Sequence, residues 1–216
     1  MEMDPTFAQS IQSPSSSETL ILLGHGITDM TIETIHVIFT KIGVYFAPQV
    51  KDHLQSFKCL PVSELLKDGS AFFQQLIQAP VSKLIKILLV KGQLGSQYAS
   101  TIETSVRDRL AYDDKYEEDE EIALANLCEF FQSKKLEPNS TIVYSWPSSS
   151  SHVEARSQKF LSGKIFFQIN EGSKAPSSFI VNNENVSTSI IEWILGENSM
   201  TPSTVESVAK SIATEC

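Results

Sequence analysis

Residues 31–46, TIETIHVIFTKIGVYF, are the stretch that most constrains the fold. The stretch is rich in β-branched and aromatic residues, and it contains one glycine and no proline. As a single extended strand it would span about 50 Å, at roughly 3.3 Å per residue, so we expect a bend or a break near Glu33 and Thr34. Apolar residues occupy both alternate sets, which predicts a central strand covered on both faces. Gly43 suggests a kink or the close approach of another segment.

The rest of the chain provides short apolar runs and amphipathic stretches in an irregular order. Runs typical of strands occur at 19–23, 83–90, 141–146, 164–169 and 179–181, and Gly24-His25-Gly26 is interpreted as a turn. Apolar residues at three- and four-residue spacing predict helices at 49–57, 61–66, 70–77, 98–110, from the acidic run at 113–121 to about 133, at 186–195 and from 202 to about 214. Without regular βαβ alternation, this order favours an α+β domain with a mostly antiparallel sheet and helices packed against it.

Length and charge limit the classes of function. The chain has 216 residues, of which 41% are hydrophobic, and this suits one domain with a sizeable core. The net charge is −9 and the sequence pI is about 4.9, which argues against binding nucleic acid or an anionic membrane through a basic field. No apolar run approaches the roughly 20 residues that a membrane span needs.

Residues 1–18 contain acids but no lysine or arginine, so they resemble neither a secretory signal nor an organellar presequence. We expect a flexible leader at 1–18, one domain at 19–216, and a cytoplasmic protein. Cys59, Cys128 and Cys216 are far apart and show neither metal-ligand spacing nor a disulfide framework. We therefore expect no metal. We also expect no nucleotide or other cofactor, because Gly24-His25-Gly26 lacks the third glycine and the following helix of a phosphate loop.

Several motifs in the same order resemble the chalcone isomerase family of plants over about residues 19–214. The motifs shared with the family as a whole are FTKIGVY at 39–45, GSQY at 95–98, and LGE at 195–197 with Pro202. The chalcone isomerase-like branch called type IV is matched by LGHGITD at 23–29, VRDRL at 106–110, DKYEE at 114–118 and FFQSK at 130–134. The resemblance implies an open-faced β-sandwich, in which a large antiparallel sheet bears a layer of helices with a ligand cleft between them.

The true isomerases of this family close a ring, when a phenolate oxygen adds to the conjugated double bond of a chalcone. This chemistry needs the phenolate held in reacting geometry and needs the developing negative charge stabilised. In the enzymes an arginine does much of this, helped by lysines, a tyrosine, a threonine and an asparagine. The resemblance places the family's cleft on nine positions of this chain: Thr28, Phe39, Thr40, Leu89, Tyr98, Thr101, Ser105, Trp193 and Ile194.

The residues at these positions lack the family's positive charges. Thr28 stands in place of the arginine, while Leu89 and Thr101 stand in place of the two lysines. Phe39, Thr40 and Tyr98 are kept, although each could equally be ordinary core packing, and Lys41 and Lys91 are the nearest candidate replacements for the lost cations. The resemblance therefore implies a protein without catalytic residues, in which Trp193 also intrudes into the cleft.

The leading hypothesis is a non-catalytic auxiliary of flavonoid biosynthesis. The type IV branch is associated with binding chalcone synthase and promoting chalcone formation, and a cleft with aromatic walls could still hold a chalcone, a flavanone or a polyketide intermediate. The acidic run 113–121 contains seven acids and one lysine, and it is either a solvated helix start or a docking surface for a basic partner. The docking candidates are Asp113, Asp114, Glu117 and Glu118.

Two alternatives remain from the sequence. A weak chalcone–flavanone isomerase is disfavoured by the missing arginine at Thr28. A fatty-acid-binding protein of the same fold is disfavoured because that branch is expected to keep the arginine and to have a transit peptide. A monomer is the default oligomeric state.

Overall fold

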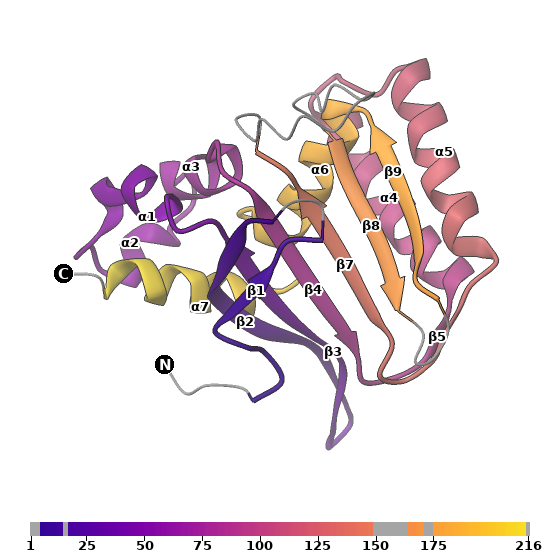
Figure 1. The fold of residues 1–216 in the computed structure, drawn as a ribbon, viewed down its shortest axis with the longest axis horizontal. Helices are drawn as coiled ribbons and strands as arrows, with labels where there is room; N and C mark the ends of the chain where they lie inside the picture. The colour runs from indigo at the N-terminus through magenta and orange to yellow at the C-terminus, as the bar shows by residue number, and fades with distance from the viewer. Residues whose placement is uncertain (1–4, 15–16, 149–163, 171–174, 215–216) are drawn as a thin grey trace.

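The protein forms one seven-stranded antiparallel sheet with a layer of helices, as the family resemblance implies (Figure 1). The computed structural model describes residues 5–14, 17–148, 164–170 and 175–214. The strand order is β1-β2-β3-β4-β7-β8-β9, and every neighbouring pair is antiparallel. The strands of this sheet are β1 (Ser10–Gln12), β2 (Thr19–Ile32), β3 (Ile35–Phe46), β4 (Lys83–Leu89), β7 (Thr141–Trp146), β8 (Lys164–Asn170) and β9 (Ser177–Asn182), and the short β5 (Gln93–Leu94) and β6 (Lys135–Leu136) pair separately.

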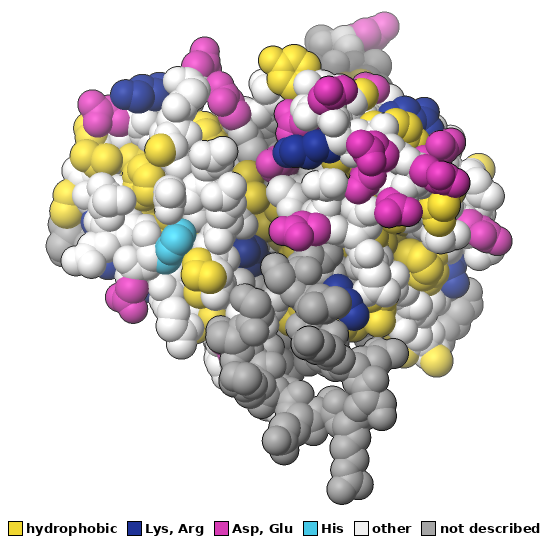
Figure 2. Space-filling view, turned by 90° about the horizontal axis from the view of Figure 1, so that it is seen from above, with side chains coloured by type: hydrophobic (Ala, Val, Ile, Leu, Met, Phe, Trp, Pro, Cys, Tyr) yellow, Lys and Arg dark blue, Asp and Glu magenta, His cyan; other side chains and the backbone are white. Residues whose placement is uncertain are grey.

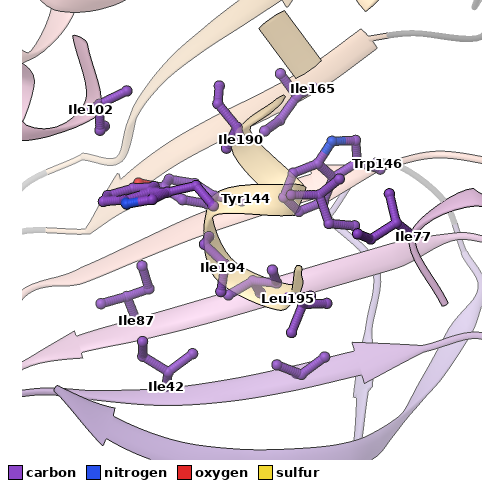
Figure 3. Packing of buried hydrophobic residues seen from close by; sticks show 14 of the residues in the cluster. Ile42, Ile77, Ile87, Ile102, Tyr144, Trp146, Ile165, Ile190, Ile194 and Leu195 are labelled. Carbon is purple, nitrogen blue, oxygen red and sulfur yellow. The ribbon is translucent and has the colours of Figure 1, made fainter. Parts of the chain in front are cut away.

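The helices lie close to where their apolar spacing predicts them. They are α1 (Val50–His53), a 3-10 turn at Gln55–Phe57, α2 (Val62–Leu65), α3 (Ala71–Gln78), α4 (Gly95–Tyr112), α5 (Glu118–Gln132), α6 (Glu184–Leu195) and α7 (Pro202–Ala213). Their apolar sides and one face of the sheet together form the main core. Figure 3 shows part of this core, with Ile190 and Ile194 of α6 packed over Tyr144 of β7 and over Ile42 and Ile87 of the neighbouring strands.

The predicted break in the long apolar stretch is a hairpin turn. β2 ends at Ile32 and β3 begins at Ile35, and Glu33 between them has a positive φ of 56°. In β3, Ile42, Val44 and Phe46 alternate into the main core. Tyr45 belongs to a smaller cluster on the other face, so the second half of β3 is covered on both sides, as expected.

The segment expected to be a flexible leader contributes to the folded domain. β1 pairs with the start of β2, and Phe7 is 4% exposed in the smaller cluster with Leu20, Tyr45 and Leu84. A Cβ atom on Gly43 would lie 2.6 Å from the Phe7 ring, so Phe7 is the segment whose close approach the glycine of β3 permits. The leader prediction therefore needs correcting at residues 7–12.

Gly24-His25-Gly26 is not a turn but lies in the middle of β2. The last helix, α7, crosses this strand so closely that a Cβ atom on Gly24 would lie 2.7 Å from the Val208 nitrogen, and one on Gly26 would lie 2.5 Å from the Thr204 nitrogen. The Ile27 nitrogen donates to the Ser203 hydroxyl at 3.1 Å. The two glycines therefore allow helix and strand to pack, and the prediction of a turn is wrong.

The cysteines correct a second expectation. Cys128 is free and buried in α5, and burial raises the pKa of its thiol to about 11, so it behaves as a small apolar side chain. Cys59 is disulfide-bonded, although the spacing of the cysteines shows no disulfide framework. The Cys59 backbone nitrogen also donates to the carbonyl of Ala213 at 3.2 Å, which ties the segment after the 3-10 turn to the end of α7.

Candidate functional site

Three of the predicted cleft residues are neighbours across the sheet. The register pairs Thr28 of β2 with Thr40 of β3, and it pairs Thr40 with Leu89 of β4. The hydroxyl oxygens of Thr28 and Thr40 are 2.6 Å apart, so each threonine satisfies the other. Thr40 is buried and Leu89 is fully buried, so this part of the sheet offers a neutral hydroxyl pair beside an apolar side chain.

Phe39 is placed differently from these three. The register passes from Thr28–Thr40 to Asp29–Ile38, so Phe39 is the extra residue of a β-bulge. Its carbonyl accepts hydrogen bonds from the backbone nitrogens of Val90 and Lys91, and its ring is 37% exposed. The bulge joins the first half of β3 to the segment that follows β4, and it leaves the Phe39 side chain partly exposed.

Three of the helix residues among the candidates, Tyr98, Thr101 and Ser105, lie in α4. A Cβ atom on Gly95 would lie 2.0 Å from the Phe131 carbonyl oxygen, so only glycine lets the start of α4 approach the end of α5 this closely. The Gln97 side chain accepts from the Leu94 nitrogen at 3.3 Å and satisfies a backbone donor at the helix start. This explains two residues of the GSQY motif by packing and capping, and it fixes the position of Tyr98.

Tyr98 is buried and is paired with Tyr144 of β7. The two phenolic hydroxyls are hydrogen-bonded to each other, and the Tyr98 ring packs against Phe131 with 5.0 Å between centroids. Burial raises the pKa of both phenols above its ordinary value, so both stay neutral. The hydroxyl that the family resemblance assigns to the cleft is therefore engaged within the core.

Thr101, Ser105 and the two residues of α6 offer little polar chemistry. Thr101 is exposed, and its hydroxyl donates to the carbonyl of Gln97 one turn earlier at 3.1 Å. Ser105 is half-buried and its carbonyl accepts from the Arg109 guanidinium at 3.0 Å. Trp193 and Ile194 are buried in the main core.

Lys41 and Lys91, the candidate replacement cations, lie in β3 and just after β4. Lys41 donates to the Thr6 hydroxyl at 3.1 Å, beside the N-terminal segment, and Lys91 is exposed after β4. Tyr144 is the residue that sequence reasoning missed. Its signal is a polar aromatic within the apolar set of TIVYSW, where Ile142 and Trp146 share its face.

The acidic docking candidates are all on the surface between α4 and α5. Asp113, Asp114, Glu117 and Glu118 are exposed, and Lys115 pairs with Asp113 at 3.0 Å. Figure 2 views the molecule from the end opposite the β2–β3 hairpin, and it shows acidic side chains gathered on the side of α4 and α5. We call these four acids and the neighbouring Tyr112, which is 92% exposed, the acidic surface.

Glu120 lies in the same run but has a structural role. It is buried, and its carboxylate accepts hydrogen bonds from the side chains of Asn183 and Asn185 at 3.0 and 2.9 Å. These hydrogen bonds lower the pKa of Glu120 and tie α5 to the start of α6. Glu120 therefore does not belong to the acidic surface.

Comparison with known proteins agrees with the architecture. The family model described as chalcone-flavanone isomerase matches residues 3–214, which is nearly the whole chain. The chain belongs to the chalcone-flavanone isomerase family. Within this family, the chain is 39% identical to chalcone isomerase-like protein 2 of Humulus lupulus, over 100% of this chain and 99% of the relative. This level of likeness confirms the chalcone isomerase-like type expected from the motifs.

More distant members have the same domain. Chalcone–flavanone isomerase 1 of Arabidopsis thaliana is 25% identical over 96% of this chain and 80% of its own length. The crystal structure of a fatty-acid binding protein of Arabidopsis thaliana superposes with a TM-score of 0.63, at 18% identity, covering 94% of this chain and 97% of that one. This second likeness supports the fold of the chain, with its antiparallel sheet and helix layer.

Within the part of the chain that the structure describes, no helix is both long and apolar enough to cross a bilayer. Among the same residues, no three histidine, cysteine, aspartate or glutamate side chains gather as they would around a metal ion.

Proposed function

We propose that this chalcone isomerase-like protein is a non-catalytic auxiliary of flavonoid biosynthesis, which binds chalcone synthase and promotes chalcone formation. The observation that supports this most directly is the hydroxyl pair of Thr28 and Thr40 beside Leu89, where the family resemblance expects an arginine and a lysine. Two threonines that satisfy each other cannot hold a phenolate or stabilise an enolate as a guanidinium would. The 39% identity to a chalcone isomerase-like protein over its whole length supports the same assignment.

The size of the electrostatic loss favours this proposal over an isomerase. One lost oxyanion donor commonly costs about 2.7–4 kcal/mol in the barrier. In this chain neutral residues occupy the arginine position and both lysine positions, and the kept tyrosine is neutral and bonded to Tyr144. Losing several such contributions together leaves little acceleration over the spontaneous ring closure.

For the interaction with chalcone synthase we propose the acidic surface. Its four carboxylates are exposed, and Lys115 neutralises one of them in part. Charges at this density attract a basic partner at long range and raise the association rate. Tyr112 adds an aromatic side chain of the kind enriched in protein interfaces.

The test measures binding to purified chalcone synthase by calorimetry or surface plasmon resonance. Neutralising the acidic surface should weaken binding by at least about tenfold, and raising the salt concentration should weaken binding to the unchanged protein. The test variant is D113N/D114N/E117Q/E118Q, and a control that removes the same charge from exposed acids elsewhere is D52N/E64Q/D68N/E129Q. Equal binding of both variants would rule out the acidic surface, and no binding of the unchanged protein would rule out chalcone synthase as the partner.

A further inference from the structure

A concave site lies at the end of the sheet opposite the β2–β3 hairpin. It has a volume of about 480 Å³, and none of the nine family cleft positions lines it. Its walls come from the end of α3, the start of β4, the end of α4, the end of β7, the start of β8 and the first half of α6. Figure 2 views the molecule from this end. The described chain therefore has a pocket separate from the family's cleft.

Lys83, the first residue of β4, lies in the wall of this pocket and is 8% exposed. Its ammonium group donates to the carbonyl of Ala79 at 2.6 Å and lies 6.0 Å from the centre of the Phe46 ring. An ammonium has three N–H donors, and the described residues provide an acceptor for one of them. No carboxylate of the described residues forms an ion pair with Lys83, so a buried positive charge borders the pocket without an anion.

Three acids, Asp113, Glu184 and Glu192, also line the pocket, and among the described residues none of them forms an ion pair with Lys83. Near the end of α4, Asp113 pairs with Lys115, and the Arg109 guanidinium donates to the carbonyls of Ser105 and Asn198. Burial raises the pKa of Glu192 in the same region. Lys164, at the start of β8, is a third lysine in the lining, after Lys83 and Lys115.

The remaining lining suits a small ligand with an apolar body. The Trp146 indole donates to the Ser187 hydroxyl at 3.0 Å and so is held in one orientation. Pro147 and Ile191 extend this apolar wall, while Thr188 adds a residue with a hydroxyl group. We propose that this pocket binds a small organic carboxylate, whose carboxylate accepts hydrogen bonds from Lys83 and whose body lies against Trp146.

Benzoate is the probe for the test, with benzamide as its neutral counterpart of the same shape. Calorimetry at pH 7 should give a Kd of about 1 mM or tighter for benzoate, and benzamide should bind at least about tenfold more weakly. Lys83→Met should weaken benzoate binding by at least about tenfold because it removes the ammonium. Lys86→Met, on the same strand but outside the pocket lining, should change the Kd by less than about twofold.

A spectroscopic readout locates the bound probe. The chain has two tryptophans, so Trp193→Phe assigns the two indole N–H signals in a ¹H–¹⁵N spectrum. Benzoate should shift the Trp146 indole signal and leave that of Trp193, in the main core, unchanged. The proposal is overturned if 20 mM benzoate shifts neither signal, if Lys83→Met binds benzoate as tightly as the unchanged protein, or if benzamide binds equally well.

Affinity should also depend on pH. Burial lowers the pKa of Lys83 to about 8, so benzoate binding should weaken by about tenfold as the pH rises from 7 to 9.5 and the ammonium loses its proton. A constant affinity over this interval would contradict the assignment to Lys83. The other charged groups that face the pocket are Arg109, Asp113, Lys115, Lys164, Glu184 and Glu192.

Discussion

Replacing Lys83 by methionine is expected to raise the free energy of unfolding by about 3 kcal/mol at pH 7, because the folded protein holds a nearly buried ammonium. Burial lowers the pKa of Lys83 from 10.5 to about 8, and each pKa unit corresponds to roughly 1.4 kcal/mol. The exposed fraction of 8% leaves little solvent screening. Methionine keeps the length of the side chain, and the Ala79 carbonyl still accepts from the Val81 nitrogen at 2.8 Å.

The sign of the pH dependence follows from the same pKa. Between about pH 8 and 10.5 the unfolded chain binds more protons at Lys83 than the folded chain, so the stability contributed by this group rises with pH. In urea unfolding, the gain in free energy of unfolding that Lys83→Met shows over the unchanged protein should therefore be smaller at pH 10 than at pH 7. Lys86→Met should stay within about 0.5 kcal/mol of the unchanged protein at both values. A Lys83→Met variant that is less stable at pH 7 would show that the buried ammonium stabilises the fold.

Tyr98→Phe is expected to lower the free energy of unfolding by about 1–3 kcal/mol, since it leaves the Tyr144 hydroxyl buried without its partner. Tyr144→Phe should lower the free energy of unfolding by a similar amount, because it leaves the Tyr98 hydroxyl buried without its partner. The double variant removes both hydroxyls from an apolar setting, so it should be more stable than the sum of the single losses predicts.

Urea unfolding of the four proteins gives this coupling energy directly. If the two losses add without coupling, the hydroxyl pair does not hold Tyr98 in the core. In that case Tyr98 would be free to face a ligand, as the family resemblance assigns it. A matched control is Tyr112→Phe, whose side chain is 92% exposed and should not affect stability.

The sequence predicts most of the fold because most elements have one apolar face. Helices α3, α4 and α6 and strands β4, β7 and β8 lie where three- and four-residue or alternate spacing places them. Local patterns fail where a distant contact decides the conformation. Gly24 and Gly26 are residues typical of a turn, yet they lie within β2. Glycine is required there because α7 packs too closely for any larger side chain. The contact of Phe7 with Gly43, which fixes the N-terminal segment, is likewise invisible to local patterns.

The candidate site was predictable only in part. Family resemblance selected Thr28, Thr40 and Leu89, and strand register brings them together. The family resemblance could not show that Tyr98 is hydrogen-bonded to Tyr144. That partner lies 46 residues away, in a strand whose sequence indicates only core packing. The pocket at Lys83 was not predicted, because its walls come from six separate elements.

Conversion of naringenin chalcone by the purified protein tests the absence of catalysis most directly. The loss of chalcone absorbance is followed at several protein concentrations, and the flavanone product is separated on a chiral column. With threonines at 28 and 40 and leucine at 89, we predict a rate equal to that in buffer at every protein concentration and a racemic product. A rate that rises with protein concentration, together with an excess of one enantiomer, would contradict a non-catalytic role.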